Sequence, residues 1–199
     1  MIKFLKKIYH AIKYMYHYIF CFRKFGHVGL GTVINKPLRV VGGVHVFIGN
    51  SCFILDGLRI EAIAKWKGKE YEPRIKIEDE VTIGQYCHFT CANRLHIGKG
   101  VSILPQVLIT DIEHEYVPDK SLRETGLEVG SVEIGDNAVI GMGARILGHR
   151  NIKIGKSAVI GTNAVVTHDV PDYAIVAGIP AKVIRKVNCE KDPNSSCDK

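Results

Sequence analysis

The feature that most constrains this chain is an aliphatic residue that returns every six positions, often with glycine directly after it. One block of such hexads covers residues 77–109, and a second block with the same spacing covers residues 134–166. A period of six fits neither the 3.6-residue repeat of a helix nor the two-residue alternation of a strand. It fits a short strand and a tight bend repeated around a polygonal coil, in which the aliphatic side chains point inward and stack between coils.

The length of each turn follows from the same spacing. Three hexads make a triangular turn of about 18 residues, but residues 77–97 and 134–154 need 20 residues to return to the Ile-Gly rhythm. We therefore expect two additional residues at one corner of each turn, Leu95-His96 and Ile152-Lys153. The glycines predict close approach of backbones and unusual backbone angles at the corners. A weaker start of the rhythm at Ile48 predicts that the coil begins before the first block.

The hexad rhythm is interrupted twice, around residues 64–76 and around residues 111–131. The first interruption is charged and holds Trp66, the only tryptophan; the second is longer, and long loops within regular scaffolds often carry function. The second opens with Thr-Asp-Ile-Glu-His-Glu-Tyr, so that carboxylates flank His114. An imidazole titrates near neutral pH and an adjacent acid can hold its tautomer, which makes His114 a candidate general base. Asp111 is a candidate to orient it or to bind the substrate.

These hexads, together with the ending Val-Pro-Asp-Tyr-Ala-Ile-Val-Ala-Gly-Ile-Pro-Ala-Lys-Val-Ile-Arg at residues 170–185, resemble the hexapeptide-repeat acyltransferases. The resemblance covers about residues 40–186 and is to the sugar O-acetyltransferase branch, with its galactoside, maltose, nodulation-factor and polysaccharide acetyltransferases. It implies an all-β solenoid, a left-handed parallel β-helix that assembles as a homotrimer. Some members place the catalytic histidine two residues after the threonine, where this chain has Ile112, and others four residues after it, which matches His114.

The resemblance also implies a reaction. His114 would take a proton from a sugar hydroxyl, the oxygen would attack the thioester of acetyl-CoA, and a backbone N–H would stabilise the oxyanion, with no covalent enzyme intermediate. The resemblance carries contacts with the coenzyme over to six positions: Met142, Thr162, Thr167, His168, Lys182 and Arg185. Lys182 and Arg185 are suitable cations for its phosphates. His168 replaces the lysine more usual at its position, which weakens the charge there.

Other chemistries remain open on the residues alone. The same base serves N-acetylation of an amino sugar, and a non-catalytic scaffold at a membrane surface needs no chemistry. A zinc carbonic anhydrase with the same coil would use three histidines across a subunit interface. The candidate ligands for such a site are His88, His96, His114 and His149. The ending at residues 170–185 and the acid-rich second interruption favour acyl transfer without a metal. Cys87 and Cys91 are interpreted as small buried residues rather than zinc ligands.

The charge of the chain is distributed unevenly. Residues 1–25 contain six Lys and Arg and no acid, so they carry +6 of the formal charge of +7, and the repeat region is nearly neutral. The charge therefore gives no support for nucleic-acid binding by the repeat region. The same segment holds eight Phe and Tyr, a composition typical of an amphipathic helix that lies in a membrane interface. Packing of that helix on the protein or on a neighbouring subunit is an equal alternative.

The expected organisation is thus an amphipathic helix at residues 1–25, a β-helix at residues 26–186 and a polar tail at residues 187–199. Scattered cysteines and the lack of a cleavable signal peptide predict a cytoplasmic protein, which the basic segment could hold at the inner face of the membrane. The predicted function is an acetyl-CoA-dependent O-acetyltransferase in polysaccharide biosynthesis, with a sugar or glycan as acceptor.

Overall fold

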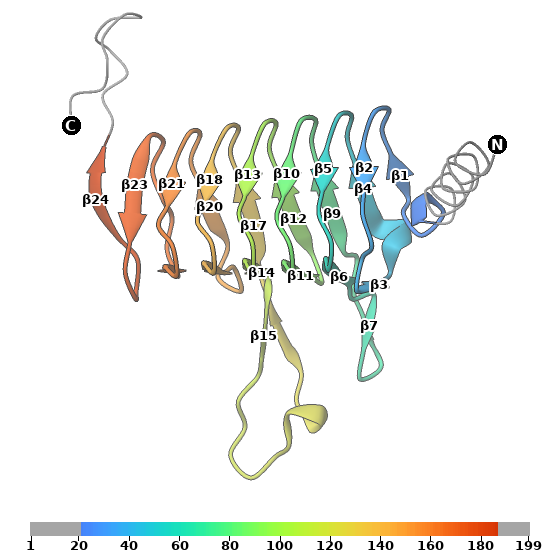
Figure 1. Cartoon of the computed structure of the whole chain (residues 1–199). Coiled ribbons are helices and arrows are strands. Elements are labelled where there is room, and N and C mark those ends of the chain that lie inside the picture. Colours follow the sequence, from blue (N-terminus) through green and yellow to red (C-terminus); the bar gives the residue numbers. More distant parts are fainter. Residues whose placement is uncertain (1–20, 187–199) are drawn as a thin grey trace, which may run out of the picture.

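The computed structural model of the protein describes residues 21–186. Most of the expected amphipathic helix at residues 1–25, and all of the polar tail, lie outside the described residues. The described chain winds as a coil whose turns stack in order along one axis, and two hairpins project from one edge of it (Figure 1). The coiled organisation expected from the hexads is confirmed.

Three sheets form the sides of the coil, and their strands are parallel except for β24; successive turns contribute successive strands to each sheet. Sheet A contains β1 (His27–Val28), β4 (Val46–Ile48), β9 (Arg74–Ile77), β12 (Arg94–Ile97), β17 (Ser131–Ile134) and β20 (Ile152–Ile154). Sheet B contains β2 (Val33–Ile34), β5 (Phe53–Ile54), β10 (Thr82–Ile83), β13 (Ser102–Ile103), β18 (Val139–Ile140), β21 (Val159–Ile160), β23 (Ala174–Ala177) and β24 (Lys182–Lys186). Sheet C contains β3 (Arg39–Val41), β6 (Arg59–Ala62), β11 (His88–Cys91), β14 (Leu108–Thr110), β19 (Arg145–Leu147) and β22 (Val165–Val166).

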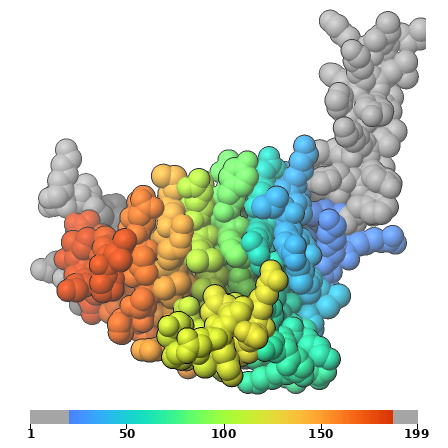
Figure 2. All heavy atoms as spheres, turned by 90° about the horizontal axis from the view of Figure 1, so that it is seen from below, coloured from blue at the N-terminus to red at the C-terminus, as the bar shows by residue number. Residues whose placement is uncertain are grey.

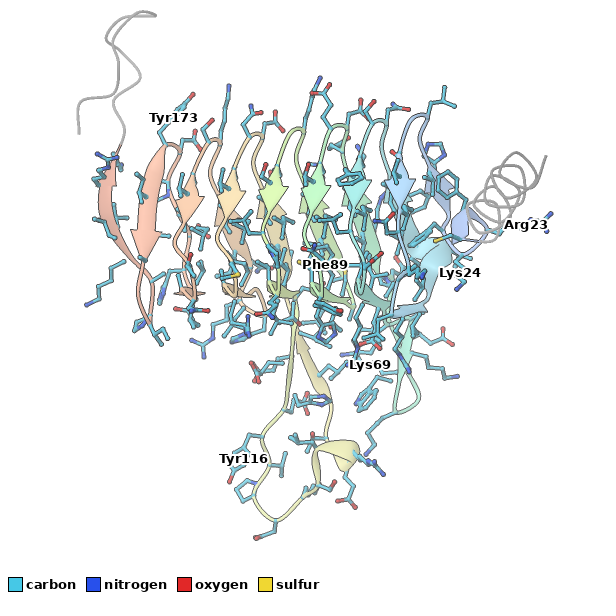
Figure 3. The ribbon with its side chains drawn as sticks, viewed as in Figure 1. Arg23, Lys24, Lys69, Phe89, Tyr116 and Tyr173 are labelled. Carbon is cyan, nitrogen blue, oxygen red and sulfur yellow. The ribbon has the colours of Figure 1, made fainter. Side chains whose placement is uncertain are left out.

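The hexad residues form the core, as predicted. Ile83 pairs in register with Ile103, which pairs with Ile140, and all three are almost completely buried. Phe89 takes the same position in sheet C and points into the coil (Figure 3). Each strand therefore stabilises its neighbours by stacking apolar side chains, the arrangement from which solenoids gain most of their stability.

The glycine after each aliphatic residue permits close approach, while the unusual backbone angles fall further along the corner. A Cβ atom added to Gly84 would lie 2.5 Å from the nitrogen of Pro105, so no side chain fits there. The left-handed conformation occurs two residues later, at Tyr86 (φ 56°), and at the equivalent Asn163 (φ 56°). Our expectation that one glycine has both roles was therefore wrong.

The two additional residues per turn also lie elsewhere than expected. Leu95 and His96 are inside β12, and Ile152 and Lys153 are inside β20, so they lengthen the strands of sheet A rather than a corner. Alternate side chains of β12 point inward and outward, and both Leu95 and Ile97 are buried. A strand needs two more residues to add one more inward position, which explains why the turn grows by two.

The two ends of the described coil are closed in different ways. At the start, Cys21 and Phe25 are buried in the same core as the first turn, next to the 3-10 helix η1 (Gly43–His45). At the other end, β24 folds back antiparallel on β23 and covers the edge of sheet B. Solenoids need such caps because their last turns would otherwise expose apolar side chains and unpaired backbone groups.

Candidate active site

Both interruptions of the hexad rhythm leave the coil at the same corner, where sheet C leads into sheet A; we call it the C–A corner. After β6 the chain forms the hairpin of β7 (Lys65–Trp66) and β8 (Lys69–Glu70). After β14 it forms the longer hairpin of β15 (Ile112–His114) and β16 (Leu127–Val129), with the 3-10 helix η2 (Leu122–Glu124) in its loop. Seen from below, the longer hairpin lies against the shorter one (Figure 2).

His114 ends the first strand of the longer hairpin. It pairs across the hairpin with Leu127, which is buried. The Nδ1 atom of His114 is itself buried and has no hydrogen-bond partner among the described residues. The Nδ1 atoms of His96 and His149 are unpaired in the same way, so this feature does not distinguish His114, and its surroundings in the hairpin have to do so.

Trp66, from the shorter hairpin, contacts the longer one twice. Its ring centroid lies 5.3 Å from that of His114 with an interplanar angle of 65°, an edge-to-face arrangement. Its Nε1–H donates a hydrogen bond of 3.1 Å to the carbonyl oxygen of Thr125, which lies just before β16. The two interruptions therefore form a single structural unit around His114.

Glu113 points to the opposite face of the hairpin, because adjacent side chains of a strand alternate. Its Oε2 atom lies 3.9 Å from Nδ1 of His149, at the C–A corner that follows β19. This contact is an ion pair only when His149 is protonated. His114 thus faces the side of the shorter hairpin, and Glu113 faces the later turns of the coil.

Asp111 does not contact His114, contrary to the expectation that it orients the base. Its carboxylate is fully buried and accepts hydrogen bonds of 2.8–2.9 Å from three consecutive backbone N–H groups of residues 92–94. The thiol of Cys91 donates to it as well, at 3.2 Å. Burial raises the pKa of Asp111, and the backbone hydrogen bonds oppose that shift. Asp111 therefore holds the previous C–A corner below the hairpin, because three successive amides form a ready anion pocket.

The cysteines of the coil are not arranged as nucleophiles. Cys87 is fully buried, and burial raises the pKa of its thiol to about 11. Burial also raises the pKa of Cys91, and the adjacent carboxylate of Asp111 adds to this shift. Since the thiolate is the reactive form, neither group supports a covalent acyl-enzyme.

The histidines considered for zinc are dispersed. His88 bonds to Glu61 at 3.2 Å on sheet C, while His96 bonds to Glu78 at 2.9 Å on sheet A. Within residues 21–186, no three His, Cys, Asp or Glu side chains gather as a metal site.

The six positions expected to contact the coenzyme occupy three places on the later turns. Met142 and Thr162 follow β18 and β21 at the corner between sheets B and C. A hydrogen bond from the N–H of Asn163 to the carbonyl of Met142 (2.9 Å) joins these two corners. Thr167 and His168 lie at the C–A corner after β22. Lys182 and Arg185 are exposed on β24, the edge strand of sheet B. The outer face of sheet C lies between Met142 and Thr162 on one side and Thr167 and His168 on the other.

Thr167 and His168 line a groove of about 740 Å³. The groove continues to His149 and Arg150 in the neighbouring turn. It is on the side of the longer hairpin that Glu113 faces. Within one chain, the hairpin therefore separates this groove from the ring of His114.

The contact between Trp66 and His114 was missing from our sequence analysis. The sequence does contain a feature that predicts this contact. Both interruptions follow the third hexad of a turn, one after Ile60 and the other after Ile109. Loops inserted at the same phase leave a solenoid at the same corner.

No protein-family model matches the chain. It is 36% identical over 165 residues to a chloramphenicol acetyltransferase of Agrobacterium fabrum, covering 81% of this chain and 74% of the relative. It is 30% identical over 166 residues to WbbJ of Escherichia coli, provisionally named a lipopolysaccharide biosynthesis O-acetyl transferase, covering 79% and 80%. The structure of a maltose O-acetyltransferase from Clostridium difficile is similar with a TM-score of 0.55 and 27% identity, over 83% and 71% of the two chains.

The chain belongs to the hexapeptide-repeat acyltransferases. This confirms the resemblance drawn from the hexads and the ending at residues 170–185. The match is shorter for some relatives: the chain spans about half (49%) of a Schizosaccharomyces pombe relative to which it is 38% identical. In this hexapeptide-repeat acyltransferase, no helix of the described residues has the length and apolarity required to cross a bilayer.

Proposed function

We propose that this protein transfers an acetyl group from acetyl-CoA to a hydroxyl of a sugar, in a cell-surface polysaccharide or its precursor. The observation that carries the proposal is His114, a histidine whose ring packs against Trp66 at the root of a hairpin on a hexapeptide-repeat coil. A relative named as an O-acetyl transferase of lipopolysaccharide biosynthesis supports an acceptor of the cell surface, and a chloramphenicol acetyltransferase supports acetyl transfer. The name of WbbJ favours O-acetylation over N-acetylation.

In the proposed reaction His114 is the general base. Because Nδ1 is buried, Nε2 is the nitrogen that takes the proton from the acceptor hydroxyl. The hydroxyl oxygen then bonds to the thioester carbonyl carbon, the C–S bond breaks, and the proton passes from His114 to the departing thiolate. The products are the acetyl ester and the free thiol of coenzyme A. No thiol of the chain takes part, which agrees with the burial of Cys87 and Cys91.

The coenzyme is proposed to lie along the later turns. The exposed cations Lys182 and Arg185 would pair with its phosphates, and the groove at Thr167 and His168 would receive the part nearer the thioester. Met142 and Thr162 would contribute backbone groups.

We propose that each active site is shared between two chains. The hairpin that carries His114 separates its ring from the coenzyme groove of the same chain, since Glu113 rather than His114 faces His149. A neighbouring chain would supply the groove, and a homotrimer, with coils of left-handed sense, is the assembly that family membership favours. Apolar side chains on the outer face of sheet B support such packing. They form two groups, Val33 and Phe53 in the early turns and Val139, Val159 and Ile175 in the later turns, with the polar Thr82 and Ser102 between them.

The acceptor is proposed to be held at the cytoplasmic face of the membrane, where the basic, aromatic residues 1–25 would attach the enzyme. Attachment to the surface on which envelope glycans are assembled would raise the local concentration of a lipid-linked acceptor.

The base is tested by thiol release from acetyl-CoA with simple galactosides, nucleotide-linked amino sugars and lipid-linked sugars as acceptors. We expect His114→Gln to lower kcat by about 10²–10⁴-fold, the usual contribution of a general base, with little change in binding of coenzyme A. His45→Gln, a substitution at the far end of the coil, is the matched control. Equal rates for wild type and His114→Gln would contradict the mechanism, and metal analysis of the purified protein tests the zinc alternative.

A further inference from the structure

We propose that Trp66 is a positioning residue for His114, and that the β7–β8 hairpin is therefore part of the active site. The inference rests on the proposed role of His114 as the base, but the contact itself can be tested without any activity. It assigns a function to the first interruption of the hexad rhythm, a charged insertion that the repeat does not require.

The first argument is the way in which Trp66 spans the longer hairpin. Its ring meets His114 at the end of β15, and its N–H bonds to Thr125 just before β16. Thr125 is buried, only 3% exposed, so this hydrogen bond is shielded from competing water. One side chain thus contacts both arms of the hairpin, one at His114 in β15 and the other at Thr125 just before β16.

The second argument is that this hairpin needs outside support. Its strands have three residues each, and an isolated two-stranded hairpin of that size is marginally stable in water. Glu113 and Glu128 also stand directly opposite each other, and like charges in that position are unfavourable. A bond at 3.1 Å and an aromatic contact from a second element supply the missing restraint.

The third argument concerns the end of the hairpin beyond His114. The backbone N–H of Glu115 bonds to the carbonyl of Gly126 at 3.1 Å, and the N–H of Gly126 bonds to the Glu115 carboxylate at 3.2 Å. A Cβ atom at residue 126 would lie 2.6 Å from that carboxylate, so a side chain there would displace the carboxylate from its bond with the N–H of residue 126. The hairpin is thus closed just beyond the base, and Trp66 fixes this closed unit against the coil.

The consequence for the reaction is geometric. A base acts efficiently only within hydrogen-bond reach of the proton, and a misplacement of about 1 Å can lower the rate by about 100-fold. An aromatic ring packed against one side of the imidazole limits its rotation and keeps water from that side. Trp66 acts through His114 and needs no contact with the acceptor.

The contact can be tested by fluorescence, because Trp66 is the only tryptophan of the chain. The emission of an indole depends on the groups packed against its ring, so we expect His114→Gln to change the intensity and the wavelength maximum of the Trp66 emission. We expect His149→Gln, on the other face of the hairpin, to leave the emission unchanged. Wild-type emission in His114→Gln, or an equal change in His149→Gln, would overturn the proposed contact.

The positioning role is tested by kinetics. We expect Trp66→Ala to lower kcat about 100-fold with an unchanged KM for acetyl-CoA, and Trp66→Phe, which retains an aromatic ring, to recover about tenfold of that loss. His45→Gln, at the far end of the coil, is the control for a general disturbance. Wild-type kcat in Trp66→Ala, or a loss in Trp66→Ala that Trp66→Phe does not reduce, would overturn the role. If no acceptor releases thiol, the proposed function fails while the fluorescence experiment still decides whether the rings meet.

Discussion

At the scale of single residues, Asp111 shows how a carboxylate next to a candidate base can have a structural role. It accepts from three consecutive backbone N–H groups inside the coil. In Asp111→Asn, an amide NH₂ would replace one acceptor oxygen and face a backbone N–H. We expect a loss of about 2–4 kcal/mol in the free energy of unfolding, measured by denaturant titration, because a buried polar group would be left unpaired.

The pH dependence of that stability shows which of two opposing effects on the pKa of Asp111 is larger, burial or hydrogen bonding to the backbone. Burial raises its pKa in the folded protein above the value in the unfolded chain, so its stabilising contribution is complete at low pH and is lost as the pH rises through the folded value. Asp111→Asn cannot titrate, so the stability advantage of the wild type over this variant should shrink as the pH rises above the ordinary aspartate range. An advantage that grows with pH would mean that the backbone hydrogen bonds outweigh burial.

At the scale of elements, the structure shows how much of the basic segment at residues 1–25 can be deleted without removing residues of the core. Cys21 and Phe25 are 3% and 7% exposed and belong to the core of the coil, so deleting residues 1–25 would damage the fold. Deleting residues 1–20 leaves both side chains in place. We expect that truncation to abolish sedimentation with vesicles of anionic phospholipid while thiol release with a soluble acceptor stays at the wild-type rate. Vesicles of neutral phospholipid are the control, and wild-type binding by the truncated protein would disprove membrane attachment.

At the scale of the whole molecule, the separation of His114 from the coenzyme groove predicts complementation between chains. His114→Gln and the double variant Lys182→Ala/Arg185→Ala should each be inactive alone. If one chain supplies the base and its neighbour supplies the coenzyme site with Lys182 and Arg185, random mixed trimers regain about one quarter of wild-type turnover, because two adjacent chains must each contribute their intact half. Refolding the two variants together and measuring thiol release tests this. A mixture as inactive as its components would place both halves in one chain.

The sequence by itself determined the repeat. Inward stacking of Ile83, Ile103 and Ile140 follows from their spacing, because burial of a regular apolar pattern has few geometric solutions. It also singled out His114 and located both interruptions. These features depend on short-range periodicity, which a chain displays directly.

The tertiary structure alone decided which side chains meet around the site. The contact of Trp66 with Thr125 joins positions 59 residues apart, and the bonds of Asp111 to the amides of residues 92–94 cross from one turn to the next. Neither contact produces a repeating pattern in the sequence, because each forms where two insertions or two turns meet at the same corner of the coil. Alternation along the strand places His114 and Glu113 on opposite faces of the hairpin. Only the tertiary structure shows that Trp66 lies on the face of His114 and His149 on the face of Glu113.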